Sequence, residues 1–309
     1  MTYRFDPELA PWIPMMPTFD ITDPVAARAE LAEQVRQVPQ YTPSQPLVIE
    51  DRTLPAPGGA PDVPVRIYTP ARRPAPLSGL LFLHGGGFVV GGMDGEDGRA
   101  QEIAAEADVV VVSVEYRLAP EHPFPAGLDD CYLALCWFAA HAPELGVDPR
   151  RIGVGGGSAG AGLSAAVALL ARDRGGPALR MQYLSIPELD DRLDSHSMTL
   201  YTDTPIWNRP NAELSWRYYL DGQEPTQYAA PARAADLRGL PAAYVDVCEF
   251  DPLRDEGIAY AQRLSQAGVP VELHLFPGTF HGSSLVTEAT VSRRMAAESL
   301  TAIRRLLHD

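Results

Sequence analysis

The sequence contains few cysteines and no long apolar run. Cys131, Cys136 and Cys248 are the three cysteines among its 309 residues, and no two of them form a C-x-x-C pair. Because all three lie in apolar segments, we expect buried thiols rather than metal ligands or redox partners. No apolar run approaches the ~18 residues that a membrane-spanning helix requires. The first residues also lack a basic region followed by an apolar one, so we expect no secretory signal and a cytoplasmic protein.

Basic side chains are scarce relative to acidic ones. The chain carries 25 lysines and arginines against 40 aspartates and glutamates, a formal net charge of −15. Proteins that bind nucleic acid or an anionic membrane surface need a basic footprint, so the sequence predicts neither partner. Hydrophobic residues make up 46% of the chain and charged residues 21%, which is typical of a globular protein. The length lies near the upper limit for one hydrophobic core, which favours one domain with an insertion over two equal domains.

Short β-branched runs alternate with helix-length segments along most of the chain. Near the N-terminus, Asp23 and Pro24 supply an N-cap and a first-turn proline for a helix. The expected strands are 63–68, 79–83, 109–114, 151–154, 181–186, 243–248 and 271–276. The expected later helices are 96–107, 126–141, 159–173, 253–267 and 287–307. This alternation predicts an α/β fold with a mostly parallel sheet and helices on both faces.

The alternation breaks once, between Pro187 and about Leu240. This stretch is too long for a plain connection, and it contains scattered prolines and several aromatic residues: Tyr201, Trp207, Trp216, Tyr218 and Tyr219. It therefore predicts an inserted cap.

The first motif with chemical meaning is a serine between two glycines. Gly156, Ser158 and Gly160 fit the pattern G-x-S-x-G, directly after the expected strand 151–154 and before an expected helix. A nucleophilic serine on a tight strand-to-helix turn has a strained backbone, so the residues two positions away must lack a bulky Cβ. This context predicts that Ser158 is a nucleophile.

The same segment also fits a second pattern. Gly155, Gly157 and Gly160 spell G-x-G-x-x-G, which marks dinucleotide binding when an acidic residue ends the next strand, roughly 20 residues on. Here the first acidic residues after the next strand, Glu188 and Asp190, come later than that spacing requires. A dinucleotide-binding oxidoreductase is therefore the less favoured interpretation.

A run of three glycines follows the expected strand 79–83. The run is His84, Gly85, Gly86 and Gly87. Glycine exposes backbone N–H groups without side-chain obstruction, and such donors can stabilise the oxyanion that forms when an acyl carbonyl is attacked. A plain flexible turn is the alternative, but beside a nucleophile the run predicts an oxyanion hole. Ala159, the residue after the serine, supplies a further N–H donor in this arrangement.

Two further residues complete a candidate triad. Asp251 and His281 both follow expected strands, at the carboxyl ends where catalytic groups collect in open α/β sheets. The chain order Ser158, Asp251, His281 is that of α/β-hydrolases. Asp251 is followed by a proline, however, so it also fits an ordinary helix N-cap.

Other residues of the same types are weaker candidates. Asp255 and Glu249 are the alternative acids. Four further histidines lie within a strand, at a helix end, in the inserted segment or at the tail, positions that favour structural or surface roles: His274, His141, His196 and His308.

Five motifs in order resemble those of the hormone-sensitive-lipase family of bacterial esterases (bacterial family IV, α/β-hydrolase fold-3). They are HGGG at 84–87, YRLAPEHPFPA at 116–126, GGSAG at 156–160, DPLRD at 251–255 and FHG at 280–282. The match spans about 80 to 285. The resemblance implies an eight-stranded sheet in a core of 46–186 and 241–309, with a helical cap made of 1–45 and 187–240.

The resemblance also implies roles for single residues. Ser158 matches the nucleophile, His281 the base and Asp251 the orienting acid. The matching oxyanion donors are Gly86, Gly87 and Ala159, and the matching supporting positions are His84, Gly85, Gly156 and Gly160. Members usually carry Asp or Thr before the serine, where this chain has Gly157. That side chain is not part of the triad, so we expect the site to be active. We also expect the turn that carries Ser158 to be less restrained.

These residues predict a serine carboxylesterase that hydrolyses short-chain acyl esters of small molecules, with no metal or cofactor. An amidase or deacetylase acting on a small metabolite uses the same triad and stays open. A small-molecule receptor of this fold requires the loss of a triad member, and none is lost here. Members of the family often dimerise through the last strand and helix, so the resemblance is compatible with a homodimer, although nothing in the sequence demands one. We expect aromatic residues of the insertion to line the acyl pocket.

Overall fold

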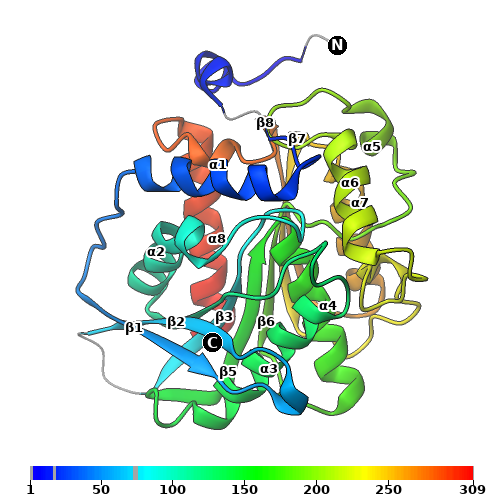
Figure 1. Cartoon of the computed structure of the whole chain (residues 1–309). Helices are drawn as coiled ribbons and strands as arrows, with labels where there is room; N and C mark the ends of the chain where they lie inside the picture. Colours follow the sequence, from blue (N-terminus) through cyan, green and yellow to red (C-terminus); the bar gives the residue numbers. More distant parts are fainter. Residues whose placement is uncertain (1–2, 17–18, 72–75, 309) are drawn as a thin grey trace.

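An eight-stranded sheet lies at the centre of the computed structural model, which describes residues 3–16, 19–71 and 76–308 (Figure 1). The strands are β1 (Leu47–Leu54), β2 (Val63–Pro70), β3 (Leu77–Leu83), β4 (Val109–Val114), β5 (Val147–Gly157), β6 (Met181–Ser185), β7 (Ala242–Phe250) and β8 (Val271–Phe280). Their spatial order is β1-β2-β4-β3-β5-β6-β7-β8. β2 is antiparallel to both its neighbours, and all the other pairs are parallel. The predicted mostly parallel, eight-stranded sheet is confirmed.

Helices cover both faces of this sheet. They are α1 (Pro24–Gln37), α2 (Asp97–Ala107), α3 (Ala126–His141), α4 (Ala159–Arg174), α5 (His196–Leu200), α6 (Arg209–Leu220), α7 (Arg254–Gln266) and α8 (Thr290–His308). Short 3₁₀ turns are η1 (Ala10–Met15), η2 (Pro57–Gly59), η3 (Met93–Glu96), η4 (Pro231–Arg233) and η5 (Ser283–Leu285). α3, α4 and α7 pack on one face, and α2 and α8 pack on the other. Within the described residues, none of the helices combines the length and the apolar content needed to cross a bilayer.

The central strands are buried on both sides, which explains their nearly continuous apolar sequences. Every residue of β3 is buried, and alternate side chains point to opposite faces. Leu81 and Leu83 belong to the apolar cluster that includes α3 and α4, whereas Leu80 and Phe82 belong to the one that includes α2 and α8.

Three strands differ from the sequence-based expectation, and one of them is β5, which runs from Val147 to Gly157 where the sequence predicts 151–154. β1 is not among the expected strands. Only Leu54 is buried in this edge strand, and three of its exposed positions carry charged residues. β8 extends to Phe280 rather than ending at 276, because the strand continues past Pro277 and Gly278 with an irregular register against β7. The longer β8 brings His281 to the end of the strand itself.

The segments 1–45 and 187–240 meet at one end of the sheet. The predicted helix start is confirmed, since the Asp23 carboxylate accepts hydrogen bonds from the backbone at the start of α1. Side chains of both segments share an apolar cluster with the loop after β3, including Ile21, Val90 and Trp207. Figure 1 shows α1 and α6 at the upper end of the sheet. The division into a cap and a core at 45/46, 186/187 and 240/241 stays a prediction.

Candidate active site

Ser158 occupies a strained turn between β5 and α4. Its backbone has φ 55° and ψ −122°, a conformation that costs free energy for any residue with a Cβ. The Ser158 N–H donates to the Ser185 carbonyl at 2.9 Å, which ties the turn to the neighbouring strand β6. The predicted strand–turn–helix context of the serine is therefore confirmed, and the side chain is 7% exposed.

The glycines around Ser158 are required by close backbone contacts. A Cβ on Gly156 or on Gly160 would lie 2.1 Å from the carbonyl oxygen of Leu83, the last residue of β3. A Cβ on Gly155 would lie 2.6 Å from the Cβ of Tyr183. The packing of the sheet thus explains these glycines without a dinucleotide.

Gly157 differs from its neighbours. A Cβ built at this position meets nothing within 4 Å, and the backbone there does not have a positive φ. The position that is usually Asp or Thr in the resembled family therefore has room for a side chain in this chain.

These contrasting surroundings predict opposite effects of the same substitution. Gly157→Ala should raise the free energy of unfolding by about 0.4–1 kcal/mol, because alanine restricts the unfolded chain and fits the native conformation. Gly160→Ala should lower it by about 3 kcal/mol or more, because its Cβ meets two backbone carbonyls that cannot move independently. Urea unfolding of both variants measures the difference. Equal losses of stability would contradict the contacts described.

Ser158, His281 and Asp251 form one hydrogen-bonded chain. His281 Nε2 lies 3.0 Å from Ser158 Oγ, and His281 Nδ1 lies 2.7 Å from Asp251 Oδ2. An ionised carboxylate only accepts, so Nδ1 carries the proton and Nε2 is free to accept the serine proton. His281 is 6% exposed and Asp251 1%, so water competes little for either bond. This arrangement can remove a proton from the serine and stabilise the resulting imidazolium.

The alternative acids contact other groups. Asp255 Oδ2 accepts from the Ser197 N–H, and Glu249 Oε2 accepts from the Gly278 N–H. The N-cap reading of Asp251 is wrong in detail, since α7 begins at Arg254 with Leu253 as its N-cap. Asp251 does organise the preceding turn, because its Oδ1 accepts from the Leu253 N–H at 2.9 Å. Its two oxygens therefore serve the turn and the histidine separately.

Three successive carbonyls of the loop after β3 are each held by a donor. His84 Nδ1 lies 2.8 Å from the Gly85 oxygen, and the Val89 and Val90 N–H groups donate to the Gly86 oxygen. The Ser215 hydroxyl on α6 lies 2.8 Å from the Gly87 oxygen. Because a trans peptide is planar, fixing a carbonyl also fixes the following N–H, which points the opposite way.

The N–H groups expected to form the oxyanion hole are available. Those of Gly86, Gly87 and Ala159 donate to no other group in the described part of the chain. The loop also lies beside Ser158, since a Cβ on Gly85 would be 3.5 Å from Ser158 Cβ. The structure therefore places Gly85 of this loop beside Ser158, and Ala159 directly follows the serine.

His84 supports this loop as a neutral imidazole. It is fully buried and stacks on Tyr116, with ring centroids 4.0 Å apart, and the Tyr116 hydroxyl donates to the His84 carbonyl at 2.7 Å. Burial lowers the pKa of His84 to about 4, against a weaker opposing effect of its bond to Gly85. The ring is thus uncharged at neutral pH, so the Nδ1 proton is the one that bonds the Gly85 oxygen.

Comparison with known proteins identifies the fold and the family. A family model described as "alpha/beta hydrolase fold" matches residues 80–285. The carboxylesterase NlhH of Mycobacterium tuberculosis is 40% identical to this chain. The alignment covers 98% of this chain and 97% of NlhH. The chain belongs to the hormone-sensitive-lipase family of α/β-hydrolases. It is a carboxylic ester hydrolase.

Two further members of the family show how far the likeness extends. A solved structure named "Bacterial Heroin Esterase" is 49% identical, with a TM-score of 0.94 over 99% of both chains. An ethyl acetate hydrolase of Pseudomonas putida is 36% identical over 77% of this chain and 78% of its own. Ester hydrolysis in the relatives argues against the dinucleotide-binding interpretation of the glycines.

Some residues at the hydrolase site had no signal in the sequence. Ser215 lies in no motif, yet its hydroxyl reaches the loop after β3. Glu188 drew attention only as an acid for a cofactor, whereas its carboxyl lies 3.0 Å from the Ser215 hydroxyl. Trp207 was one of several aromatic residues in the insertion; its ring centroid lies 6.0 Å from that of His281.

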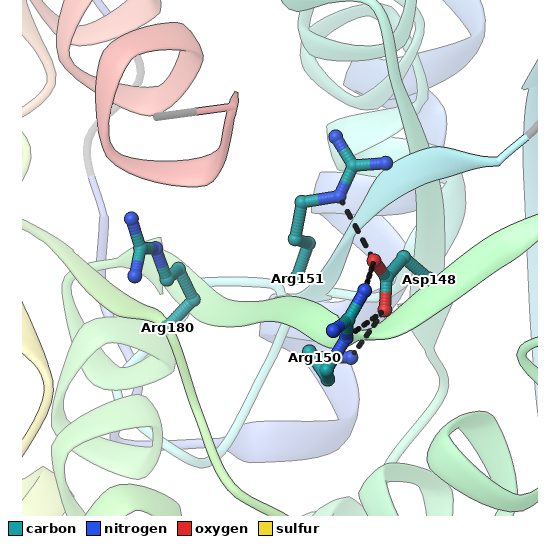
Figure 2. Close-up of a pocket in the computed structure, with 4 residues that line it drawn as sticks. All are labelled: Asp148, Arg150, Arg151 and Arg180. Atoms are coloured by element: carbon teal, nitrogen blue, oxygen red, sulfur yellow. Dashed lines mark hydrogen bonds and ion pairs between the residues drawn. The ribbon is translucent and has the colours of Figure 1, made fainter.

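Two other polar clusters lie away from the triad. A cavity of about 310 Å³ is lined by Asp148, Arg150, Arg151 and Arg180 at the start of β5, at the opposite end of that strand from Ser158. Figure 2 shows Asp148 paired with Arg150 and Arg151. The second cluster is Glu272, His274 and Glu298, in which Glu272 is already paired with both His274 and Arg305.

Proposed function

We propose that this hydrolase cleaves short-chain acyl esters of small molecules through an acyl-enzyme formed on Ser158. The observation that carries the proposal is the single imidazole that bridges Ser158 Oγ and Asp251. The relative named for ethyl acetate, an ester with a two-carbon acyl group, supports a short acyl chain.

The first half of the reaction transfers the acyl group to the enzyme. His281 Nε2 takes the hydroxyl proton as Ser158 Oγ attacks the ester carbonyl carbon, and Asp251 stabilises the imidazolium. The N–H groups of Gly86, Gly87 and Ala159 hold the oxyanion of the tetrahedral intermediate, which by itself supplies several kcal/mol. His281 then protonates the leaving oxygen, and the alcohol departs.

The second half regenerates the enzyme. Water attacks the acyl carbon as His281 accepts its proton, and the same N–H groups hold the second oxyanion. The imidazolium returns the proton to Ser158 Oγ as the bond to the acyl carbon breaks, and the carboxylic acid leaves. The sum is ester plus water giving acid plus alcohol, with no other reactant.

A chain-length series tests the acyl preference. We expect 4-nitrophenyl acetate and butyrate to be hydrolysed with kcat/KM about tenfold or more above the decanoate, since a pocket for a short acyl group does not accommodate the added methylenes. Release of 4-nitrophenolate is the measurement. A maximum at long chains would contradict the proposal.

An amide with the same acyl group distinguishes the alternative chemistry, with release of 4-nitroaniline as the measurement. 4-Nitroacetanilide presents an amide in place of the ester of 4-nitrophenyl acetate and is otherwise matched. We expect turnover of the ester only. Comparable turnover of the anilide would favour the amidase or deacetylase interpretation, which requires no change in the triad.

A further inference from the structure

A buried carboxyl group contacts the loop that carries the expected oxyanion donors. Ser215 Oγ lies 2.8 Å from the Gly87 oxygen and 3.0 Å from Glu188 Oε1. Both Ser215 and Glu188 are fully buried. Of the four donors described above for the carbonyls of this loop, the Ser215 hydroxyl is the one that comes from the 187–240 segment, so it links α6 to Gly87.

The number of protons decides how these three groups bond. A serine hydroxyl has one proton to donate, and a carbonyl oxygen can only accept. If Glu188 is a carboxylate, it competes with Gly87 for the single Ser215 proton. If Glu188 is a carboxylic acid, it donates to Ser215 Oγ while Ser215 donates to Gly87, and every contact is satisfied.

The surroundings of Glu188 favour the acid. Its second oxygen, Oε2, has no hydrogen-bond partner among the described residues, an expensive state for a charged oxygen in the interior. Burial raises the pKa of Glu188 to about 8; the contact with Ser215 lowers it and Asp251 raises it. The titratable groups facing it from the packed elements are Asp251 after β7, Glu256 on α7 and Tyr219 on α6, none of them a cation.

We propose that Glu188, as a carboxylic acid, is a positioning residue for the oxyanion loop. It donates to Ser215, which holds the carbonyl of Gly87 and so restrains the residue whose own N–H is one of the expected donors. Loss of the proton diverts the Ser215 hydroxyl to the carboxylate and releases Gly87. This inference rests on the proposed function of Ser158 and its N–H donors.

Glu188→Gln tests the role of the proton, because the amide can donate to Ser215 at every pH. For the wild type we expect kcat for 4-nitrophenyl acetate to fall about fivefold as pH rises through about 8. This fall is smaller than the one that follows removal of a whole oxyanion donor. The variant should lose about twofold at pH 7, because an amide is a weaker donor, and show no such fall. The same basic limb in both proteins would overturn the proposal.

Ser215→Ala removes the link itself. We expect kcat to fall about tenfold at pH 7 with KM changed less than about twofold, and the limb near pH 8 to disappear, since the contact acts on the transition state. Ser78→Ala is the matched control: Ser78 is equally buried and its hydroxyl donates to the Leu307 carbonyl at 2.9 Å. A fall in kcat equal in both variants would reduce Ser215 to a packing role and overturn the proposal.

Two measurements distinguish a failure of the proposed role of Glu188 from a failure of the proposed function. Infrared difference spectra between pH 6 and pH 10 should show a protonated carboxyl band that Glu188→Gln lacks; a wild type without that band contradicts the proposal whatever the activity. Labelling of Ser158 by a fluorophosphonate reports the nucleophile independently. If Ser158 is labelled but the pH profiles coincide, the role of Glu188 fails and the esterase mechanism stands. If Ser158 is not labelled and no ester is cleaved, the proposed function itself fails.

Discussion

Replacing Ser158 with alanine should lower kcat for 4-nitrophenyl acetate by about 10⁴-fold or more. The alanine variant keeps the donors of the loop after β3 and the substrate-binding surroundings, but it has no oxygen to form the acyl-enzyme. The His281 imidazole then has only water to activate. Steady-state kinetics on the purified variant measures the loss, with residual turnover set by the remaining N–H donors.

An exposed serine supplies the control for this experiment. Ser265 lies on α7 with its side chain in solvent, so Ser265→Ala should turn over the ester like the wild type. A fluorophosphonate should label the wild type and the control with one equivalent and leave the Ser158 variant unlabelled. If Ser158→Ala kept a substantial share of the wild-type rate, the nucleophile would have to be another residue.

Asp251→Asn should have a loss of similar size, about 10⁴-fold in kcat. An asparagine can present an N–H to His281 Nδ1, which favours the tautomer with its proton on Nε2. That tautomer cannot accept the proton of Ser158, although the geometry of the site is preserved. Steady-state kinetics with 4-nitrophenyl acetate at pH 7 measures the loss in kcat.

The other two candidate acids provide matched controls. Asp255→Asn and Glu249→Gln change contacts with the Ser197 and Gly278 N–H groups and leave His281 untouched. We expect each to keep kcat within about threefold of the wild type, as for changes outside the reacting groups. A loss with Asp255→Asn as large as that with Asp251→Asn would move the role of the acid away from Asp251.

Much of the fold is predictable because most of its sheet is buried on both sides. A strand such as β3 must be apolar at every position, so its sequence alone identifies it. β1 escapes this rule because its side chains face solvent, and its Glu50, Asp51 and Arg52 do not indicate a strand. β8 is cut short in the prediction because Pro277 and Gly278 ordinarily end strands.

The residues of the candidate site also include some that the sequence predicts and some that it does not. Ser158, Asp251 and His281 follow strands that end at the same edge, so their convergence can be predicted from the strand pattern, and the hydrogen bonds between them agree. Ser215 and Glu188 cannot be found in this way. Their contacts depend on how α6 packs over the loop after β3, and no periodicity or motif records that packing.

The carbonyl oxygen of Leu83 lies against two glycines, one on each side of Ser158 in the sequence. Both contacts join the main chain of β3 to positions that have no side chain. The position of Ser158 relative to β3 is therefore held by main-chain contacts in addition to the aliphatic residues that fill the interior. A protein engineer can exchange many of those residues for others of similar volume and keep the reacting oxygen in register, provided that Gly156 and Gly160 are left alone.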